Sequence, residues 1–471
     1  MSDFNKKVDN LSQNCYSRRE ALKMMTFGAV GLAMSGTLLS ACKQNGAGGS
    51  SADIKTEAPG GTSIVSRDWA SLGDKVGLLG LGCMRLPSKP GSRQLDQEQV
   101  NAMVDYALEH GVNYFDTAPA YGDSERATGE ALSRHDRSSY LLATKMSNFA
   151  AGPVSPSLED AKAMFARSLA NLRTDYFDFY LLHGLSDVND FTKRYVDNGL
   201  IEWLKEQKEA GAIRHLGFSF HGSNDNLKAI LDLPYKWDFV QIQMNWLDWK
   251  NMPLGRGGAD SPKCDSETLY NMLVERNIPV AVMEPIRGGA LANVNEGVKN
   301  KLAEKHPELT PAGVALSFVG SFPGVMVTLS GMSNMAQLKE NVATFTGFKA
   351  FDDSDNAFLE KVADLYNSNK HIPCTGCQYC MPCPNGVNIP GNFALYNAAS
   401  DNLNIPNPDG VHDAEFKRKR KDFLKHYNKN LEDGMRADAC TKCNACISKC
   451  PQHIRIPDQL KMISTLVENL G

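Results

Sequence analysis

Residues 97–121 read QEQVNAMVDYALEHGVNYFDTAPAY, and this stretch decides the fold. Its first half repeats apolar residues at the spacing of an amphipathic helix: Val100, Met103, Val104 and Ala107. His110-Gly111 ends that helix, and the short apolar run Val112–Phe115 that follows is typical of a buried parallel strand. The stretch therefore predicts one helix–strand step of an α/β protein, with polar residues directly after the strand.

The same alternation continues on both sides of this step. Eight short apolar runs separated by helical stretches are expected to be strands: Leu78–Gly82, Val112–Phe115, Tyr140–Thr144, Phe177–Leu182, Ile213–Phe218, Phe239–Gln243, Pro279–Met283 and Val325–Leu329. Eight strands alternating with helices predict a (β/α)8 TIM barrel. The alternative is an open doubly wound sheet, which usually carries a glycine-rich dinucleotide turn. The nearest approach to such a turn, GLLGLG at 77–82, has the wrong glycine spacing.

Two cysteine runs lie near the C-terminus, and they read C-x2-C-x2-C-x2-C-P (Cys374, Cys377, Cys380, Cys383) and C-x2-C-x2-C-x3-C-P (Cys440, Cys443, Cys446, Cys450). The second run has the bacterial ferredoxin spacing. Zinc sites also use C-x2-C pairs, but two triplets of this kind exceed the four ligands that zinc needs. We therefore expect two [4Fe–4S] clusters in a small, mostly helical ferredoxin-like domain.

The fourth cysteine of each run ligates the other cluster in two-cluster ferredoxins. By that rule Cys450 joins the first three cysteines of the first run, and Cys383 joins the first three of the second. The shortened first run and the long insertion between the runs leave this crossed pairing open.

The N-terminus resembles a twin-arginine signal joined to a lipoprotein signal. It has SRREALK at 17–23, an apolar stretch over 24–39 and then LSAC ending at Cys42, although Ala21 stands where the pattern usually has a bulky apolar residue. The resemblance implies that residues 1–41 are removed, that Cys42 carries lipid, and that the protein is exported and anchored to a membrane facing the periplasm. An amphipathic helix with a chance Arg-Arg pair is the alternative. The Gly- and Ser-rich residues 42–62 indicate a flexible tether.

Charge narrows the class of partner. The 471-residue chain has a formal net charge of −4, and residues 1–41 hold five Lys or Arg against three Asp or Glu, which leaves about −6 for the remainder. This balance argues against nucleic acid as the main partner. The basic run Lys417–Lys421 is read as a solvated helix face; the alternative is a contact for an anionic lipid surface or an acidic redox partner protein.

Four titratable groups follow the second, third and fourth predicted strands: Asp116, Tyr121, Lys145 and His183. In a TIM barrel such positions converge on one mouth, where active sites lie. A buried lysine lowers the pKa of a neighbouring tyrosine, and a carboxylate keeps that lysine charged. With a histidine to polarise the oxygen, this set suits hydride transfer to a carbonyl, although each member alone also has a structural explanation.

Residues from about 64 to 348 resemble the aldo/keto reductase family through segments in the family order: FDTAPAYGDSERATGEAL, TKM, LLHG, GFSFHG and SGMSNMAQLKEN. The resemblance implies that Tyr121 is the general acid, that Lys145 and Asp116 tune it, and that hydride comes from a bound nicotinamide. His183 would orient the carbonyl of a small carbonyl or alcohol substrate, for which a sugar-like molecule is one candidate. The cysteine-rich end resembles the ferredoxin-fused branch of the family, so we expect a barrel over 63–350 and a 4Fe-4S domain over 351–471.

The resemblance also implies the contacts of the NAD(P)H cofactor. Ser219 and Gln241 would bind the nicotinamide amide, and Glu340 with Asn341 would meet the adenine. The family often places two cations for the 2′-phosphate of NADP, but those slots are Gly331 and Gln337 here, so that Ser333 and Lys339 would have to compensate. NAD and NADP both stay open.

Two other functions compete with an oxidoreductase. One is an exported iron–sulfur electron-transfer protein whose barrel is a scaffold, and the other is a module that binds a sugar or ketone without turnover. The loops at 147–157 and 246–263 are candidates for substrate specificity, and Trp246 and Trp249 are either stacking platforms or packing residues.

Overall fold

The computed structural model describes residues 54–57, 62–69, 71–92, 94–149, 157–252, 264–368, 372–401, 405–408, 410, 412–452 and 454–471, and these fall in one compact unit, residues 48–471. The twin-arginine segment and Cys42 lie outside the described residues. Within the described part of the chain, every helix is too short or too polar to cross a membrane.

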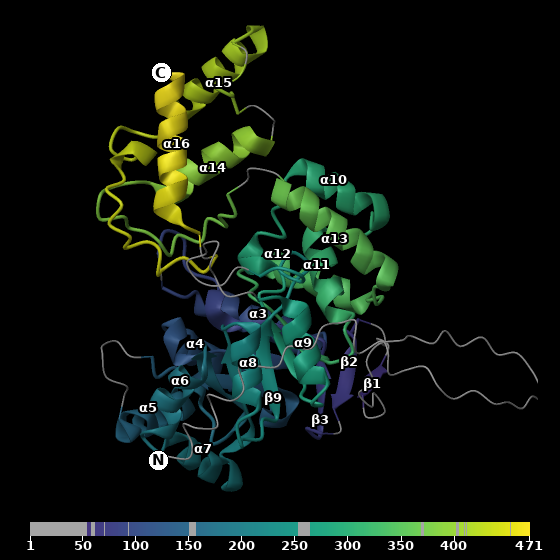
Figure 1. Cartoon of the computed structure of the whole chain (residues 1–471). Coiled ribbons are helices and arrows are strands. Elements are labelled where there is room, and N and C mark those ends of the chain that lie inside the picture. Colours follow the sequence, from purple (N-terminus) through teal and green to yellow (C-terminus); the bar gives the residue numbers. More distant parts are fainter. Residues whose placement is uncertain are drawn as a thin grey trace, which may run out of the picture. The chain divides into compact units, whose positions relative to one another are not determined.

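Eight parallel strands close into a barrel, which confirms the predicted (β/α)8 architecture (Figure 1). They are β4 (Leu79–Gly82), β5 (Tyr114–Asp116), β6 (Leu141–Met146), β7 (Phe177–Leu185), β8 (Ile213–Phe220), β9 (Phe239–Gln243), β10 (Val280–Met283) and β11 (Val325–Ser330). They pair in chain order, and β11 closes the ring by pairing with β4, with Thr328 opposite Leu79. The open-sheet alternative is excluded.

Helices cover the outside of this ring and are positioned by ordinary caps. They are α3 (Gln97–Glu109), α4 (Ser124–Leu132), α5 (Leu158–Leu172), α6 (Val188–Phe191), α7 (Leu200–Glu209), α8 (Asn224–Leu231), α9 (Ser266–Val274), α10 (Glu296–Lys305), α11 (Pro311–Gly320) and α12 (Met335–Thr346). The helix over residues 97–109 ends where the sequence predicts it, and its apolar stripe is buried. Asp96 caps it by accepting a hydrogen bond from the Gln99 amide.

Three short strands precede the barrel: β1 (Ile54–Glu57), β2 (Ser66–Trp69) and β3 (Asp74–Gly77) (Figure 1). The strand β1 lies inside the segment 42–62 that the sequence predicts to be a flexible tether, so that prediction is wrong for these four residues. The reason is that β2 offers an edge, and Ile54–Glu57 pairs with it in antiparallel register. The glycine-rich composition around the strand gives no sequence signal for a four-residue pairing of this kind.

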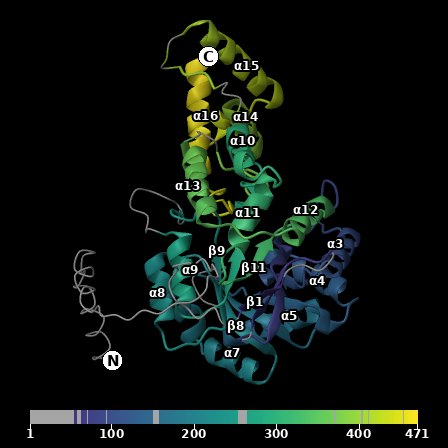
Figure 2. The same cartoon turned by 90° about the vertical axis from the view of Figure 1, so that its right-hand side faces the viewer.

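The helix α13 (Asp353–Ser368) also corrects a boundary. The sequence places residues 351–471 in the 4Fe-4S domain, but Leu359, Val362 and Tyr366 of α13 pack into the same apolar core as the barrel helices. The helix lies beside α10, as Figure 2 also shows. The apolar stripe of α13 therefore belongs to the barrel, and the cysteine-rich lobe begins after it.

The C-terminal lobe has its own core. Its helices are α14 (Ile389–Asp401), α15 (Ala414–Asn430) and α16 (Ile456–Leu470), which pack on one another (Figure 2). Buried side chains between them form a separate cluster: Ile372, Val387, Ile389, Phe393, Tyr396, Tyr427, Leu431, Ile454, Ile456, Leu460 and Ile463. The two cysteine runs lie in loops on either side of α14 and α15, so the helices hold the loops together. The basic run 417–421 lies on α15.

Candidate active site and iron–sulfur centres

The four predicted catalytic residues come from three neighbouring strands and meet at the carboxyl-terminal mouth of the barrel. Asp116 ends β5, Lys145 lies near the end of β6, and His183 lies in the last part of β7. Tyr121 ends a short 3-10 turn, Pro119–Tyr121, that follows β5. Because adjacent parallel strands end at one edge, the sequence order of these segments fixes their convergence.

Lys145 and Asp116 form a buried ion pair at the base of the site. The Lys145 Nζ donates to Asp116 Oδ1 at 2.6 Å and to the Thr117 carbonyl at 2.8 Å, and the two side chains are 1% and 6% exposed. Burial opposes the ammonium, but Asp116 and Tyr121 outweigh it and raise the pKa of Lys145. Burial raises the pKa of Asp116 against the pull of Lys145. The lysine therefore keeps the proton of the pair.

Tyr121 lies over this pair, with Lys145 Nζ 5.0 Å from the centre of its ring. The sequence predicts a lowered pKa for this phenol, and the net direction of that prediction is wrong. Burial is the largest influence and raises the pKa of Tyr121, whereas Lys145 lowers it by less. The hydroxyl is therefore protonated at neutral pH, which is the form that donates a proton.

His183 faces Tyr121 edge-on, with ring centres 5.7 Å apart. Its Nδ1 lies 2.6 Å from Ser147 Oγ, and Phe149 lies over it with ring centres 4.8 Å apart. Burial, with the nearby charge of Lys145, holds the pKa of His183 well below its usual range. The imidazole is therefore neutral at pH 7, and Ser147 is a partner that the sequence motifs did not reveal.

Arg194 supports this side of the mouth from a π-helical turn, Thr192–Val196. Its guanidinium is buried and donates to the His183 carbonyl at 2.6 Å and to Asn148 Oδ1 at 2.9 Å. It also lies 5.0 Å from the centre of the Phe149 ring, and Phe149 is 44% exposed. The result is a hydrogen-bonded wall behind His183 with one exposed aromatic ring beside the predicted catalytic groups.

Ser219 and Gln241, the predicted nicotinamide contacts, both lie at this mouth and are buried. Ser219 Oγ accepts from the Gly184 amide at 2.8 Å, which leaves its hydroxyl hydrogen for another partner. Gln241 Oε1 is buried without a hydrogen-bond partner. Buried polar atoms are rarely left unpaired, so a free acceptor beside a hydroxyl donor fits the carboxamide of a nicotinamide.

The predicted adenine and phosphate contacts lie on the loop after β11 and on α12. Gln337 and Ser333 bond to each other, with Ser333 N donating to Gln337 Oε1 at 2.7 Å. Glu340 accepts from Thr310 Oγ1 at 2.6 Å, and the buried Asn341 donates to Ser330 Oγ at 3.0 Å. Gly331 lies against the Arg85 side chain, which places an arginine beside one of the slots that lacks a cation.

A polar network after β10 was missed by the sequence analysis. Arg287 donates to the buried Asp248 at 3.1 Å, and Asn245 donates to the Glu284 carbonyl at 3.2 Å. Arg85 donates to the Gly288 carbonyl at 2.7 Å. Glu284, Arg287 and Gly288 lie in the segment MEPIRGG at 283–289, which carries no motif that predicts this network. Burial raises the pKa of the Glu284 carboxyl.

The eight cysteines of the lobe form two groups, and each group takes one member from the other run. Cys374, Cys377, Cys380 and Cys450 line one small pocket, which we call the first cysteine group. Cys446 interacts with Cys440, Cys443 and Cys383, which we call the second cysteine group. This is the crossed arrangement that the ferredoxin rule predicts. Burial and the neighbouring thiols raise the pKa of Cys380 to about 12 and that of Cys446 to about 11.

The lining of the first pocket suits an iron–sulfur cluster. Its four cysteines match the four thiolates that hold one [4Fe–4S] cluster. Apolar side chains of Ile389, Phe393, Ile454 and Ile456 complete the first pocket, and an apolar shell of this kind suits a buried cubane.

Several other predicted features are structural. Trp246 and Trp249 are 2% and 7% exposed and pack in the core, so they offer no stacking surface. Cys83 and Cys264 are buried, with the pKa of each raised to about 12 by burial.

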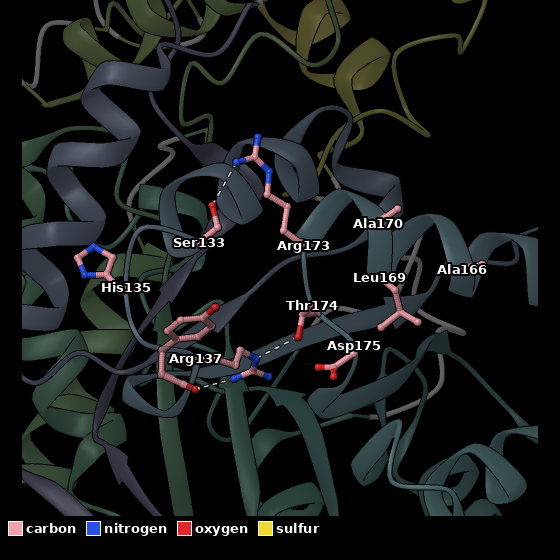
Figure 3. Close-up of a pocket in the computed structure, with 10 residues that line it drawn as sticks. Ser133, His135, Arg137, Ala166, Leu169, Ala170, Arg173, Thr174 and Asp175 are labelled. Carbon is pink, nitrogen blue, oxygen red and sulfur yellow. Dashed lines mark hydrogen bonds between the residues drawn. The ribbon is translucent and has the colours of Figure 1, made fainter.

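A hollow of about 720 Å³, with Arg137 and Arg173 among its lining residues (Figure 3), lies before β6 and β7. It is therefore at the amino-terminal end of the barrel, away from the four predicted catalytic residues.

Comparisons with known proteins agree with this geometry. The aldo/keto reductase family profile matches residues 78–364, and a 4Fe-4S dicluster domain matches residues 373–455. The uncharacterized oxidoreductase YqkF of Bacillus subtilis is 28% identical over 314 residues, which cover 62% of this chain and 95% of that protein. The L-galactose dehydrogenase of Arabidopsis thaliana is 30% identical over 328 residues, covering 66% and 97%.

Among solved structures, the holo form of the aldo-keto reductase AKR11C1 from Bacillus halodurans is 25% identical with a TM-score of 0.48, covering 66% of this chain and 96% of that one. The family profile spans more than half of the chain, and the barrel carries the family's segments in order. The chain therefore belongs to the aldo/keto reductase family of oxidoreductases, with a C-terminal 4Fe-4S dicluster domain.

Proposed function

We propose that the barrel catalyses hydride transfer between a nicotinamide cofactor and a small carbonyl or alcohol substrate, with Tyr121 as the general acid. The observation that carries this proposal is the Lys145–Asp116 pair, buried under Tyr121 with a 2.6 Å bond. A scaffold or a binding module has no use for a buried charge in this place, because a buried pair is seldom worth its desolvation. A site that must stabilise a phenolate needs that cation.

The reaction follows from the protonation states of the four residues. The nicotinamide, when bound, supplies a hydride to the carbonyl carbon. Tyr121 gives its proton to the developing alkoxide oxygen, and Lys145 stabilises the phenolate that is left. Asp116 keeps Lys145 charged and in place. The products are an alcohol, an oxidised nicotinamide and a tyrosinate that takes its proton back from solvent.

His183 orients the substrate oxygen. Because the ring is neutral, only one of its nitrogens carries hydrogen. Nδ1 lies 2.6 Å from Ser147 Oγ. In the proposed tautomer the serine hydroxyl donates to Nδ1, so that the imidazole hydrogen is on Nε2 and points to the substrate oxygen. Ser147 is then a positioning residue that fixes the tautomer.

The substrate is sugar-like. The exposed Phe149 ring beside His183 gives an apolar face against which the C–H face of a sugar ring can pack. A relative that matches two thirds of this chain is an L-galactose dehydrogenase, which supports the same substrate class. Arg85 beside Gly331 supplies a cation near the cofactor loop, so NADP is bound as well as NAD.

The two cysteine groups each hold one [4Fe–4S] cluster and exchange electrons with a separate redox partner protein. The N-terminal signal exports the folded protein, and lipid on Cys42 anchors it to a membrane facing the periplasm; the LSAC motif supports this location. Cys42→Ser would abolish incorporation of labelled palmitate in cells. Labelling that persists would show that Cys42 is not the lipid site.

The experiment for the catalytic proposal compares Tyr121→Phe with Tyr176→Phe. Tyr176 packs under Arg137 outside the mouth, with the guanidinium 4.0 Å from its ring, and serves as the matched control. We expect Tyr121→Phe to bind NADPH normally and to lose carbonyl reduction about 10²–10⁴-fold, the usual contribution of a general acid. Full activity of Tyr121→Phe would favour the electron-transfer alternative, in which the barrel is a scaffold.

A further inference from the structure

One glutamine of the cysteine-rich lobe reaches the mouth of the barrel. Gln452 follows the cluster ligand Cys450 by two residues, and its side chain lines the pocket of the first cysteine group. The residue is 7% exposed, so its amide is enclosed by protein. Gln452 therefore belongs to the immediate surroundings of the first cluster.

The same amide also lies against the loop after β10. A Cβ atom added at Gly288 would lie 1.9 Å from Gln452 Nε2 and 3.1 Å from an Arg85 nitrogen, so the glycine leaves the space that Gln452 occupies. Gly288 has φ +63°, a left-handed conformation that favours glycine. The loop and the glutamine are thus fitted to each other at van der Waals distance.

Glu284 connects this contact to the catalytic residues. It is half-buried, it has φ +56°, and Gln452 is among the groups that act on its carboxyl. Its charge in turn raises the pKa of the Tyr121 phenol, as a smaller influence than burial, Lys145 and Asp116. Glu284 is therefore coupled electrostatically to Tyr121 and also acts on Gln452, which lines the pocket of the first cysteine group.

The amide of Gln452 is incompletely satisfied. Its Nε2 is buried and forms no hydrogen bond of ordinary geometry, although it acts on the Glu284 carboxyl at looser geometry. A buried donor held this loosely is unusual and indicates a group that can change partner. Its surroundings include the Glu284 carboxyl and the thiols of the first cysteine group, which would hold the first cluster. Hydrogen bonds to cluster sulfurs are a known determinant of reduction potential.

We propose that Gln452 is a positioning residue that couples the barrel mouth to the first cluster, so that occupancy of the mouth by a nicotinamide changes the reduction potential of that cluster. The inference rests on the proposed nicotinamide function of the barrel. A ligand that moves Glu284 or the Gly288 loop shifts the Gln452 amide relative to the cluster. Because linkage is reciprocal, the redox state of the cluster changes nicotinamide affinity by the same factor.

The test uses the mature, cluster-loaded chain under anaerobic conditions and tetrahydro-NADPH, a nicotinamide analogue that cannot transfer hydride. Binding is followed by tryptophan fluorescence, and the cluster potentials are measured by redox titration with electron paramagnetic resonance. We expect the analogue to bind one redox state at least threefold more tightly, which equals a potential shift of about 28 mV at 59 mV per tenfold for one electron. The shift should affect one cluster.

Two variants and two matched controls locate the coupling. Gln452→Ala removes the amide, and Gly288→Ala displaces it, so both should bind the analogue and lose the shift. Gln378→Ala changes a glutamine in the same cysteine pocket that is exposed, and should keep the shift. Gly73→Ala imposes the same backbone strain at φ +69° with no neighbour within 4 Å, and should also keep it.

The outcomes separate the two proposals. If the analogue binds the wild type but no potential moves, or if the shift persists in both Gln452→Ala and Gly288→Ala, the coupling is refuted while the nicotinamide function stands. If the analogue does not bind the wild type at all, the proposed nicotinamide function fails, and the coupling fails with it.

Discussion

Replacing Lys145 by methionine tests the electrostatic basis of the site without relying on any substrate. Methionine keeps the unbranched stem and removes the charge that Asp116 meets at 2.6 Å. With both side chains almost fully buried, the carboxylate left behind loses its counter-charge and is shielded from solvent. It will take up a proton at neutral pH, because burial already raises the pKa of Asp116 against the opposing effect of Lys145.

The expected loss of folding stability follows from the free energy needed to keep Asp116 protonated at pH 7. Holding an ordinary aspartate protonated at pH 7, about three units above its free pKa of about 3.9, costs about 4 kcal/mol at 1.36 kcal/mol per unit. This value agrees with the loss of stability of about 3–5 kcal/mol that is usual when one partner of a buried ion pair is removed. The folded variant binds a proton that its unfolded chain does not. The loss of stability should therefore shrink by about 1.4 kcal/mol for each pH unit from 7 towards 4.

Urea unfolding followed by tryptophan fluorescence reports on the barrel, because all five tryptophans lie between Trp69 and Trp249. The control is Lys162→Met, which removes an ion pair to the exposed Glu159 and should leave the unfolding midpoint unchanged. Wild-type stability of Lys145→Met at pH 7 would refute the reasoning. So would a loss of stability that does not change between pH 7 and pH 4, since the proton on Asp116 would then play no part.

Three further predictions concern the chemistry of the two sites. Because burial raises the pKa of Tyr121, kcat/KM for carbonyl reduction should stay constant from neutral to weakly alkaline pH. Alcohol oxidation needs the phenolate, so its kcat/KM should rise with pH. Equal pH profiles in the two directions would contradict this prediction. Ser147→Ala should lower kcat about tenfold or more with little change in nucleotide affinity, and Ser147→Thr should restore it; a change in affinity alone would contradict the tautomer role. Cys450→Ser should remove the same electron paramagnetic resonance signal as Cys374→Ser, and Cys383→Ser should remove the other one; loss of the same signal in Cys450→Ser and Cys440→Ser would show that the ligands are not crossed.

Much of the barrel could be predicted because its strands are buried on both faces. Continuous apolar runs such as Phe239–Gln243 predict the strand with the bounds that the structure has. The strand β1 could not be predicted in this way, because its four residues depend on pairing with β2 rather than on their own apolar pattern. The helix α13 was assigned to the wrong part of the chain because an amphipathic stripe does not say which core it covers.

In the candidate site, too, some features could be predicted from the sequence and others could not. The convergence of Asp116, Lys145 and His183 was predictable because they lie towards the carboxyl ends of neighbouring strands. The net pKa direction of Tyr121 was not, because it depends on how far burial outweighs the neighbouring cation. The contact of Gln452 with the Gly288 loop joins residues far apart in the chain, and no spacing rule brings such residues together.

The most direct test of the central claim is the fate of the hydride. The cluster-loaded protein is incubated anaerobically with NADPH deuterated at C4 and a panel of aldoses and small aldehydes, and the alcohol product is analysed by mass spectrometry. The account predicts one deuterium on the former carbonyl carbon of the product in the wild type and none with Tyr121→Phe over the same time. Product that forms without deuterium from either face of C4, or at the same rate in Tyr121→Phe, would contradict it.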